Sequence, residues 1–158
     1  MNNHIRILDY KFDKELLLLQ AEEARKTSSP YTDVRYPELT FDDWHIGHYT
    51  SPYIEKIMRD FDIKGKPRFY WLEPYAEIPT HTDNGTRCSL NLVLTEDAAP
   101  IQIGHENEMK TYNYEVALLN TTIPHSVLNN DKQRIMLKIS VFDDFFETVN
   151  AKINSKKL

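Results

Sequence analysis

The sequence predicts a mainly β protein of the α+β class, with its helices gathered near the N-terminus. From residue 67 onward, short runs rich in branched and aromatic residues recur about every ten residues, separated by turn signals. Helical patterns precede this region and do not alternate with the strands. Many short strands without intervening helices indicate a sandwich, barrel or jelly roll rather than a parallel α/β sheet.

Residues 1–66 are expected to form a helical support for the β region. Asp13 can cap a helix that runs to about Arg25, because an aspartate side chain accepts hydrogen bonds from first-turn amides. The candidates for burial on this helix are Leu16, Leu19 and Ala24.

A second helix is expected to begin at Ser51 and Pro52 and to reach about Asp60, since a serine cap followed by proline favours a helix start. Residues 5–8 suit a short opening strand. Residues 31–50 are rich in aromatic residues and histidine, follow neither strand nor helix periodicity, and are expected to be irregular.

The β core is expected to span residues 67–142, and residues 143–158 to form a C-terminal helix or tail. Its strands are expected at 68–75, 77–82, 88–94, 100–103, 108–112, 115–119, 123–127 and 133–142. In the last strand the even-numbered residues 134–140 share one face, and the odd-numbered residues 135–141 form an apolar face that is core.

Composition favours a single domain over residues 1–158, because a chain of this length with 41% hydrophobic residues can bury a core. One cysteine, Cys88, excludes an internal disulfide framework. The N-terminus lacks the apolar run of a signal peptide, so we expect a cytoplasmic protein without a membrane partner. A net charge of −5 argues against a general nucleic-acid binder.

His81, Asp83 and His125 form the pattern that says most about function. A His-x-Asp pair and one distant histidine make up the 2-His-1-carboxylate facial triad, which suits non-haem Fe(II) with open positions. Residues two apart in a strand point to the same face, so His81 and Asp83 can meet at one point. The third ligand, His125, must come from another strand.

Arg134 lies a short strand beyond His125, where such an iron centre needs an anchor for an acidic co-substrate. Its guanidinium can form a bidentate, charge-assisted pair with a carboxylate. Lys138 shares the same strand face and is the competing candidate. Whether His45 and His48 contribute to the site is left open by the sequence, because Gly47 weakens a helix there.

Two stretches of the chain resemble a known superfamily. The segment 75–84, followed by Arg87 to Leu90, looks like the His-x-Asp region of 2-oxoglutarate/Fe(II)-dependent dioxygenases, and 124–142 is similar to the end of their core. The likeness is strongest to the prolyl hydroxylase and aspartyl/asparaginyl β-hydroxylase-like branches. It implies a double-stranded β-helix, the jelly-roll architecture shared with cupins.

The resemblance also implies roles for individual residues. Iron would be ligated by His81, Asp83 and His125, and Arg134 would bind the distal carboxylate of 2-oxoglutarate. Further candidates for holding the co-substrate include Tyr70 and Asn91, and Arg87 would orient an acidic or peptide-like substrate.

The activity implied by the resemblance is hydroxylation of an unactivated C–H bond, with consumption of O2 and release of succinate and CO2. The substrate expected from it is an amino-acid residue in a protein or peptide, or a free amino acid. Two alternatives stay open: a cupin-like metal enzyme that does not use 2-oxoglutarate, and a non-catalytic barrel that binds a small acid or peptide.

Overall fold

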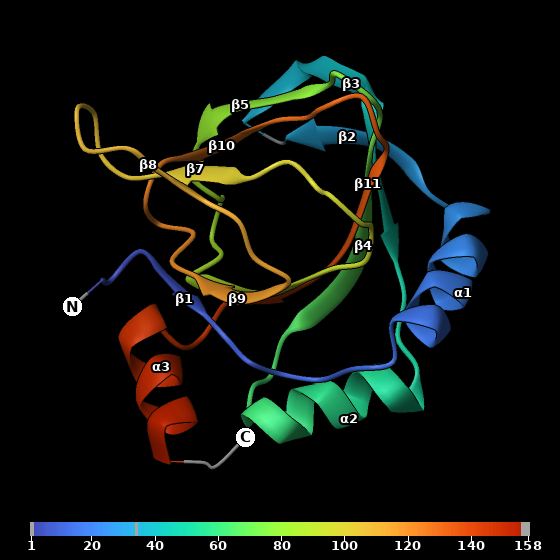
Figure 1. Cartoon of the computed structure of the whole chain (residues 1–158). Helices are drawn as coiled ribbons and strands as arrows, with labels where there is room; N and C mark the ends of the chain where they lie inside the picture. The colour runs from blue at the N-terminus through green and yellow to red at the C-terminus, as the bar shows by residue number, and fades with distance from the viewer. Residues whose placement is uncertain (1, 34, 156–158) are drawn as a thin grey trace.

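The computed structural model describes residues 2–33 and 35–155, and the last part of the expected tail, 156–158, lies outside the described residues (Figure 1). Its strands outnumber its helices and form two antiparallel sheets. The expected mainly β, jelly-roll architecture is therefore confirmed. None of the helices in the described chain is long and apolar enough to cross a membrane.

The larger sheet has seven strands in the order β1-β9-β6-β11-β4-β3-β2. Their bounds are β1 Ile5–Ile7, β2 Ser29–Asp33, β3 Tyr36–His48, β4 Lys66–Leu72, β6 Cys88–Val93, β9 Val116–Leu119 and β11 Arg134–Val141. The smaller sheet has the order β5-β10-β7-β8. Its strands are β5 Glu77–His81, β7 Ile101–Ile103, β8 Lys110–Tyr112 and β10 His125–Leu128.

Three helices cover the outer side of the larger sheet, away from the smaller sheet: α1 Lys14–Arg25, α2 Pro52–Phe61 and α3 Phe146–Ser155 (Figure 1). The first two begin at the expected caps. The Asp13 side chain accepts a hydrogen bond from the Leu16 amide, and the Ser51 hydroxyl accepts one from the Ile54 amide.

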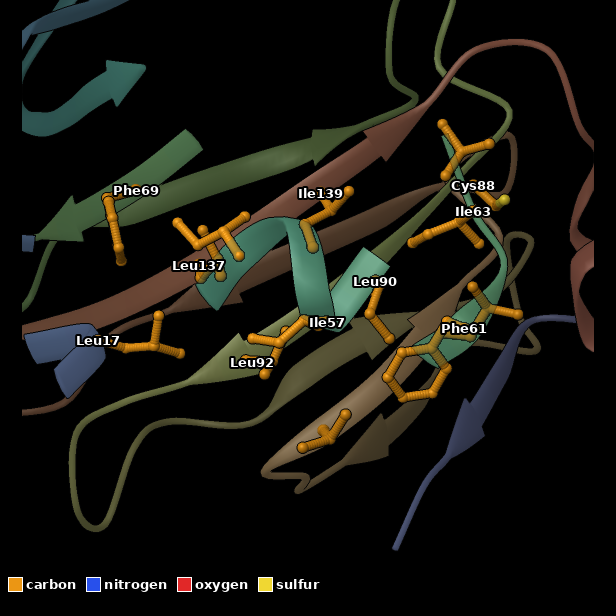
Figure 2. Close-up of a cluster of buried hydrophobic side chains, with 14 of the residues drawn as sticks. Leu17, Ile57, Phe61, Ile63, Phe69, Cys88, Leu90, Leu92, Leu137 and Ile139 are labelled. Carbon is orange, nitrogen blue, oxygen red and sulfur yellow. The ribbon is translucent and has the colours of Figure 1, made fainter. Parts of the chain in front are cut away.

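Strand alternation divides the interior into two cores. In β4 and β11, Phe69 and Leu137 point to the helices and pack against residues such as Leu17 of α1 (Figure 2). Their neighbours Tyr70 and Met136 point the other way, into the space between the two sheets. Both faces of β11 are thus buried, and its polar face lies inside the barrel.

The segment 31–50, expected to be irregular, is mostly strand. β3 pairs with β4 in the register Trp44↔Leu72 to His48↔Arg68, and β2 pairs with β3. This expectation was wrong because hydrogen bonding to a distant strand, rather than local propensity, makes the segment extended. His45 and His48 accordingly lie on a strand and not on a helix.

The buried face of α1 also differs from the expected one. Leu17, Ala21 and Ala24 are buried, whereas Leu16 is half-buried and Leu19 is 64% exposed. The run of four leucines at 16–19 is apolar on every side of the helix, so the sequence alone does not show which side of the helix faces the core. The contact with the sheet selects Leu17.

Leu17→Ala should lower the free energy of unfolding by about 2–5 kcal/mol, because it removes a fully buried side chain. Leu19→Ala, two residues away on the same helix, should change it by less than about 0.5 kcal/mol. Urea unfolding of both variants checks this. Equal losses at the two positions would contradict the packing of α1 described here.

Candidate metal centre and its two cavities

The structure brings His81, Asp83 and His125 together between the two sheets. His81 is the last residue of β5, and it lies directly opposite His125, the first residue of β10, in an antiparallel pair. Asp83 follows in the loop after β5, and its amide donates to the Thr121 carbonyl at 3.1 Å. One ligand atom from each of the three residues lies within 4.8 Å of the others.

Backbone hydrogen bonds fix both imidazole rings. Nδ1 of His81 lies 2.7 Å from the Pro79 carbonyl oxygen, and Nδ1 of His125 lies 2.8 Å from that of Ile123. A carbonyl oxygen only accepts, so each Nδ1 carries a proton and the Nε2 of a neutral ring is left with its lone pair.

The two Nε2 atoms converge on one oxygen of Asp83. Oδ1 lies 3.1 Å from Nε2 of His125 and 3.4 Å from Nε2 of His81. Two nitrogen lone pairs and a carboxylate oxygen that point to the same place repel one another. A cation bound between them removes that repulsion. The donor set, two imidazoles and one carboxylate, therefore fits non-haem iron.

The other oxygen of Asp83 is held by Lys138, whose Nζ lies 2.6 Å from Oδ2. Burial raises the pKa of the Asp83 carboxyl, but the charge of the Lys138 ammonium opposes burial, and that pKa is held well below its usual range. Burial lowers the pKa of Lys138, but the negative charge of Asp83 opposes burial, and the pKa of Lys138 lies above its usual value. The pair is a buried carboxylate and a buried ammonium.

A small cavity of about 40 Å³, called here the inner cavity, lies on one side of the metal centre and includes His81 and His125 in its wall. Arg134 is 4% exposed there, with Nη2 at 3.4 Å from the Tyr114 hydroxyl and Nη1 at 3.6 Å from the Met136 sulfur. Within the described chain, Arg134 has no acidic partner and its Nε has no hydrogen-bond acceptor.

Asn91 completes this polar group. Its amide nitrogen donates to the Tyr114 hydroxyl at 3.1 Å, while its oxygen accepts from Ser89 at 2.9 Å. The inner cavity therefore ends in a buried cation flanked by a phenol and an amide.

A second cavity of about 160 Å³, called here the outer pocket, opens beside His81 and Asp83. Its other lining residues are Tyr31, Thr32, Trp44, Arg68, Tyr70, Asn84, Thr86 and Lys138. Trp44, Tyr70, His81 and Lys138 line both cavities, so the metal centre lies between them.

The structure places most of the sequence-predicted site residues around this centre. Arg134, Tyr70 and Asn91 line the inner cavity. Arg87 does not line either cavity: it is exposed, and its guanidinium lies over the ring of Phe145 at 4.4 Å. The structure therefore does not place Arg87 at the mouth of either cavity, where the sequence analysis expected it.

His45 and His48 lie in β3, and the cluster of potential metal ligands found in the described residues does not include them. The cavity residues that the sequence did not single out include Tyr114, Arg68 and Trp44. Tyr114 lies between two strand signals, and the other two are ordinary members of aromatic-rich stretches. No short-range signal in the sequence distinguishes them.

Solved structures share this fold. A prolyl hydroxylase from Trichoplax adhaerens, in complex with a hypoxia-inducible-factor oxygen-degradation-domain peptide, aligns with a TM-score of 0.72 at 14% identity, covering 98% of this chain and 88% of its own. A prolyl-4-hydroxylase from Pseudomonas putida aligns with a TM-score of 0.65 at 15% identity, covering 88% and 93%. A 2OG-Fe(II) oxygenase-family protein from Burkholderia pseudomallei gives 0.61 at 15%, covering 87% and 84%.

Comparison with curated protein sequences finds no match. A family model does match: that of the aspartyl/asparaginyl β-hydroxylases, over residues 48–144. This range is more than half of the chain and contains all three candidate ligands together with Arg134. The suspected superfamily is thereby confirmed, and the chain belongs to the aspartyl/asparaginyl β-hydroxylase family.

Proposed function

We propose that the protein is a 2-oxoglutarate- and Fe(II)-dependent hydroxylase. It converts a C–H bond of an amino-acid residue in a protein or peptide, or of a free amino acid, into C–OH. One molecule each of O2 and 2-oxoglutarate is consumed, and succinate and CO2 are released. The observation that carries the proposal is a three-ligand metal centre adjoining a cavity that ends in a buried arginine.

His81, Asp83 and His125 would hold the iron, because their free donor atoms already converge. When bound, the iron supplies the oxidising chemistry that couples decarboxylation of 2-oxoglutarate to hydroxylation of the substrate. The chain's own residues would hold the metal through two imidazoles and one carboxylate and would orient both organic molecules.

Arg134 would bind the distal carboxylate of 2-oxoglutarate. A buried charge is costly unless it is paired, and no acidic side chain among the described residues pairs with this one. A dicarboxylate that reaches from the metal centre to Arg134 supplies the missing partner. The Tyr114 hydroxyl and the Asn91 amide lie beside the guanidinium and would complete the binding of that carboxylate.

Lys138 would position the carboxylate ligand. By holding Oδ2 of Asp83 it directs Oδ1 towards the two histidine Nε2 atoms. The sequence left Lys138 as a competitor of Arg134 for the co-substrate. Its ion pair with Asp83 engages Lys138 at the metal centre and leaves Arg134 as the cation of the inner cavity.

Two comparisons support the choice of substrate class. The family name refers to hydroxylation of aspartyl and asparaginyl residues, and the Trichoplax adhaerens structure contains a peptide. An amino-acid residue within a polypeptide is therefore the leading substrate, and a free amino acid is the second. We propose a cytoplasmic location, because a single cysteine, Cys88, suits a reducing compartment.

Anaerobic titration with Fe(II) and 2-oxoglutarate should produce the weak visible charge-transfer band of the chelated complex in the wild-type protein. His81→Ala should abolish the band, because it removes a ligand. Arg134→Ala should raise the 2-oxoglutarate concentration needed for half of the band by about 10- to 100-fold, the loss of a charged hydrogen bond. Arg134→Lys should recover part of this loss.

Gln133→Ala is the matched control, since this neighbour of Arg134 is exposed and bonds only to Glu73 in the described structure. A wild-type protein that is folded and binds Fe(II) but gives no band would contradict the use of 2-oxoglutarate and favour a cupin-like enzyme. A protein that binds no iron would favour the non-catalytic barrel.

Lys138→Met should destabilise the metal-free protein by about 3–5 kcal/mol, because it leaves the Asp83 carboxylate buried without its cation. Anaerobic Fe(II) should then raise the unfolding temperature of the variant more than it raises that of the wild type, because the metal replaces the missing positive charge.

Lys152→Met provides the control, because the Lys152–Asp144 pair is about one third exposed and contributes at most about 1 kcal/mol. Thermal unfolding with and without Fe(II) checks both variants. If Fe(II) stabilised Lys138→Met no more than the wild type, Lys138 would not act through the metal ligand.

A further inference from the structure

The outer pocket contains a second arginine without an acidic partner. Arg68 of β4 lies opposite Lys138 in the β4–β11 register, and it donates from Nη2 to the Ser140 hydroxyl at 3.1 Å. Its guanidinium lies 5.5 Å from the ring centroid of Tyr70. Across the described residues no carboxylate is within ion-pair distance of Arg68, and its buried Nε has no acceptor.

A second donor in the same pocket also lacks a partner. Trp44 is 5% exposed, and its indole Nε1 has no acceptor among the described residues. Its ring stacks on Tyr31 with centroids 3.8 Å apart and lies 6.3 Å from the ring of His81. Buried donors are nearly always hydrogen-bonded in folded proteins, whereas, in the described structure, Trp44 Nε1 and Arg68 Nε are two unpaired donors on residues that line this pocket.

The charges in the outer pocket also favour a negatively charged ligand. Its charged side chains are Arg68, Lys138 and Asp83, and the last two neutralise each other at 2.6 Å. The Arg68 charge remains unbalanced. A divalent cation at the centre would make the pocket more positive still, so a bound group with negative charge is favoured there.

The outer pocket also has the size and walls of a site for one small group. Its volume of about 160 Å³ is bounded by the aromatic rings of Tyr31, Trp44 and Tyr70, and its polar side is formed by Asn84 and Thr86. His81 and Asp83 line the same pocket, so a group held by Arg68 would lie in a pocket that adjoins the metal centre.

We propose that the outer pocket binds the substrate through a carboxylate, with Arg68 as the anchor and the Trp44 ring as part of the pocket wall. The proposal rests on the proposed function and specifies its substrate chemistry. The carboxylate can belong to a free acidic amino acid or to an acidic residue in a peptide. Arg134 in the inner cavity then binds 2-oxoglutarate, and Arg68 in the outer pocket binds the substrate, so each carboxylate pairs with a different arginine.

The test compares carboxylate probes with their amides. Protein loaded with Fe(II) and 2-oxoglutarate is given L-aspartate or L-glutamate, and separately end-capped peptides of the form Gly-Asp-Gly and Gly-Glu-Gly, each against its Asn or Gln counterpart. The measurements are perturbation of the anaerobic charge-transfer band and, in air, probe-stimulated release of CO2 from 2-oxoglutarate. The free and capped arms distinguish the two sources of the carboxylate.

We expect at least one carboxylate probe to stimulate CO2 release at least about 10-fold more than its amide. Arg68→Gln should raise the KM for that probe by about 10- to 100-fold, while the charge-transfer band and the 2-oxoglutarate concentration that forms it stay unchanged. Arg68→Lys should restore part of the affinity. Arg87→Gln, which alters an exposed arginine outside both cavities, should behave like the wild type.

Several results would overturn the proposal: amides as effective as carboxylates, an unchanged KM in Arg68→Gln, or no response to any carboxylate probe at millimolar concentration while the charge-transfer band forms. A KM effect in Arg87→Gln equal to that in Arg68→Gln would do the same. Loss of the charge-transfer band in the wild type would instead refute the proposed function, so the two failures are distinguishable.

Discussion

The arrangement of the site depends on positive charge buried between two sheets. The inward faces of β4 and β11 present Arg68, Lys138 and Arg134 to a space that is otherwise largely apolar. Asp83 is the acidic residue that lines this space in the described chain, and it pairs with Lys138. Buried charge is stable only when it is compensated, so the buried Arg134 and the half-buried Arg68 both favour ligands that carry negative charge.

This constraint explains how the two cavities are divided. Arg134 lies at the buried end of the inner cavity with Tyr114 and Asn91, while Arg68 lies in the outer pocket beside Trp44. The metal ligands occupy the wall between them. A co-substrate in one cavity and a substrate in the other would both reach the same metal without competing for the same cation.

The convergence of the three candidate ligands follows the sequence prediction, which rests on residue types whose chemistry is a local property. His81, Asp83 and His125 were chosen from spacing and ligand preference, and β5–β10 pairing places them together. The argument from strand alternation does not apply to Asp83, since β5 ends at His81 and the hydrogen bond from the Asp83 amide to the Thr121 carbonyl holds the aspartate in the loop.

By itself the sequence determined the fold class, the eight core strands and the candidates for metal and carboxylate binding, because periodicity and donor type are local properties. Only the tertiary structure decided that Arg68 and Tyr114 line cavities, that Arg87 does not, and that Lys138 pairs with Asp83. Those outcomes depend on which distant strands are neighbours. An arginine on a strand has the same local pattern whether it faces solvent or a buried pocket.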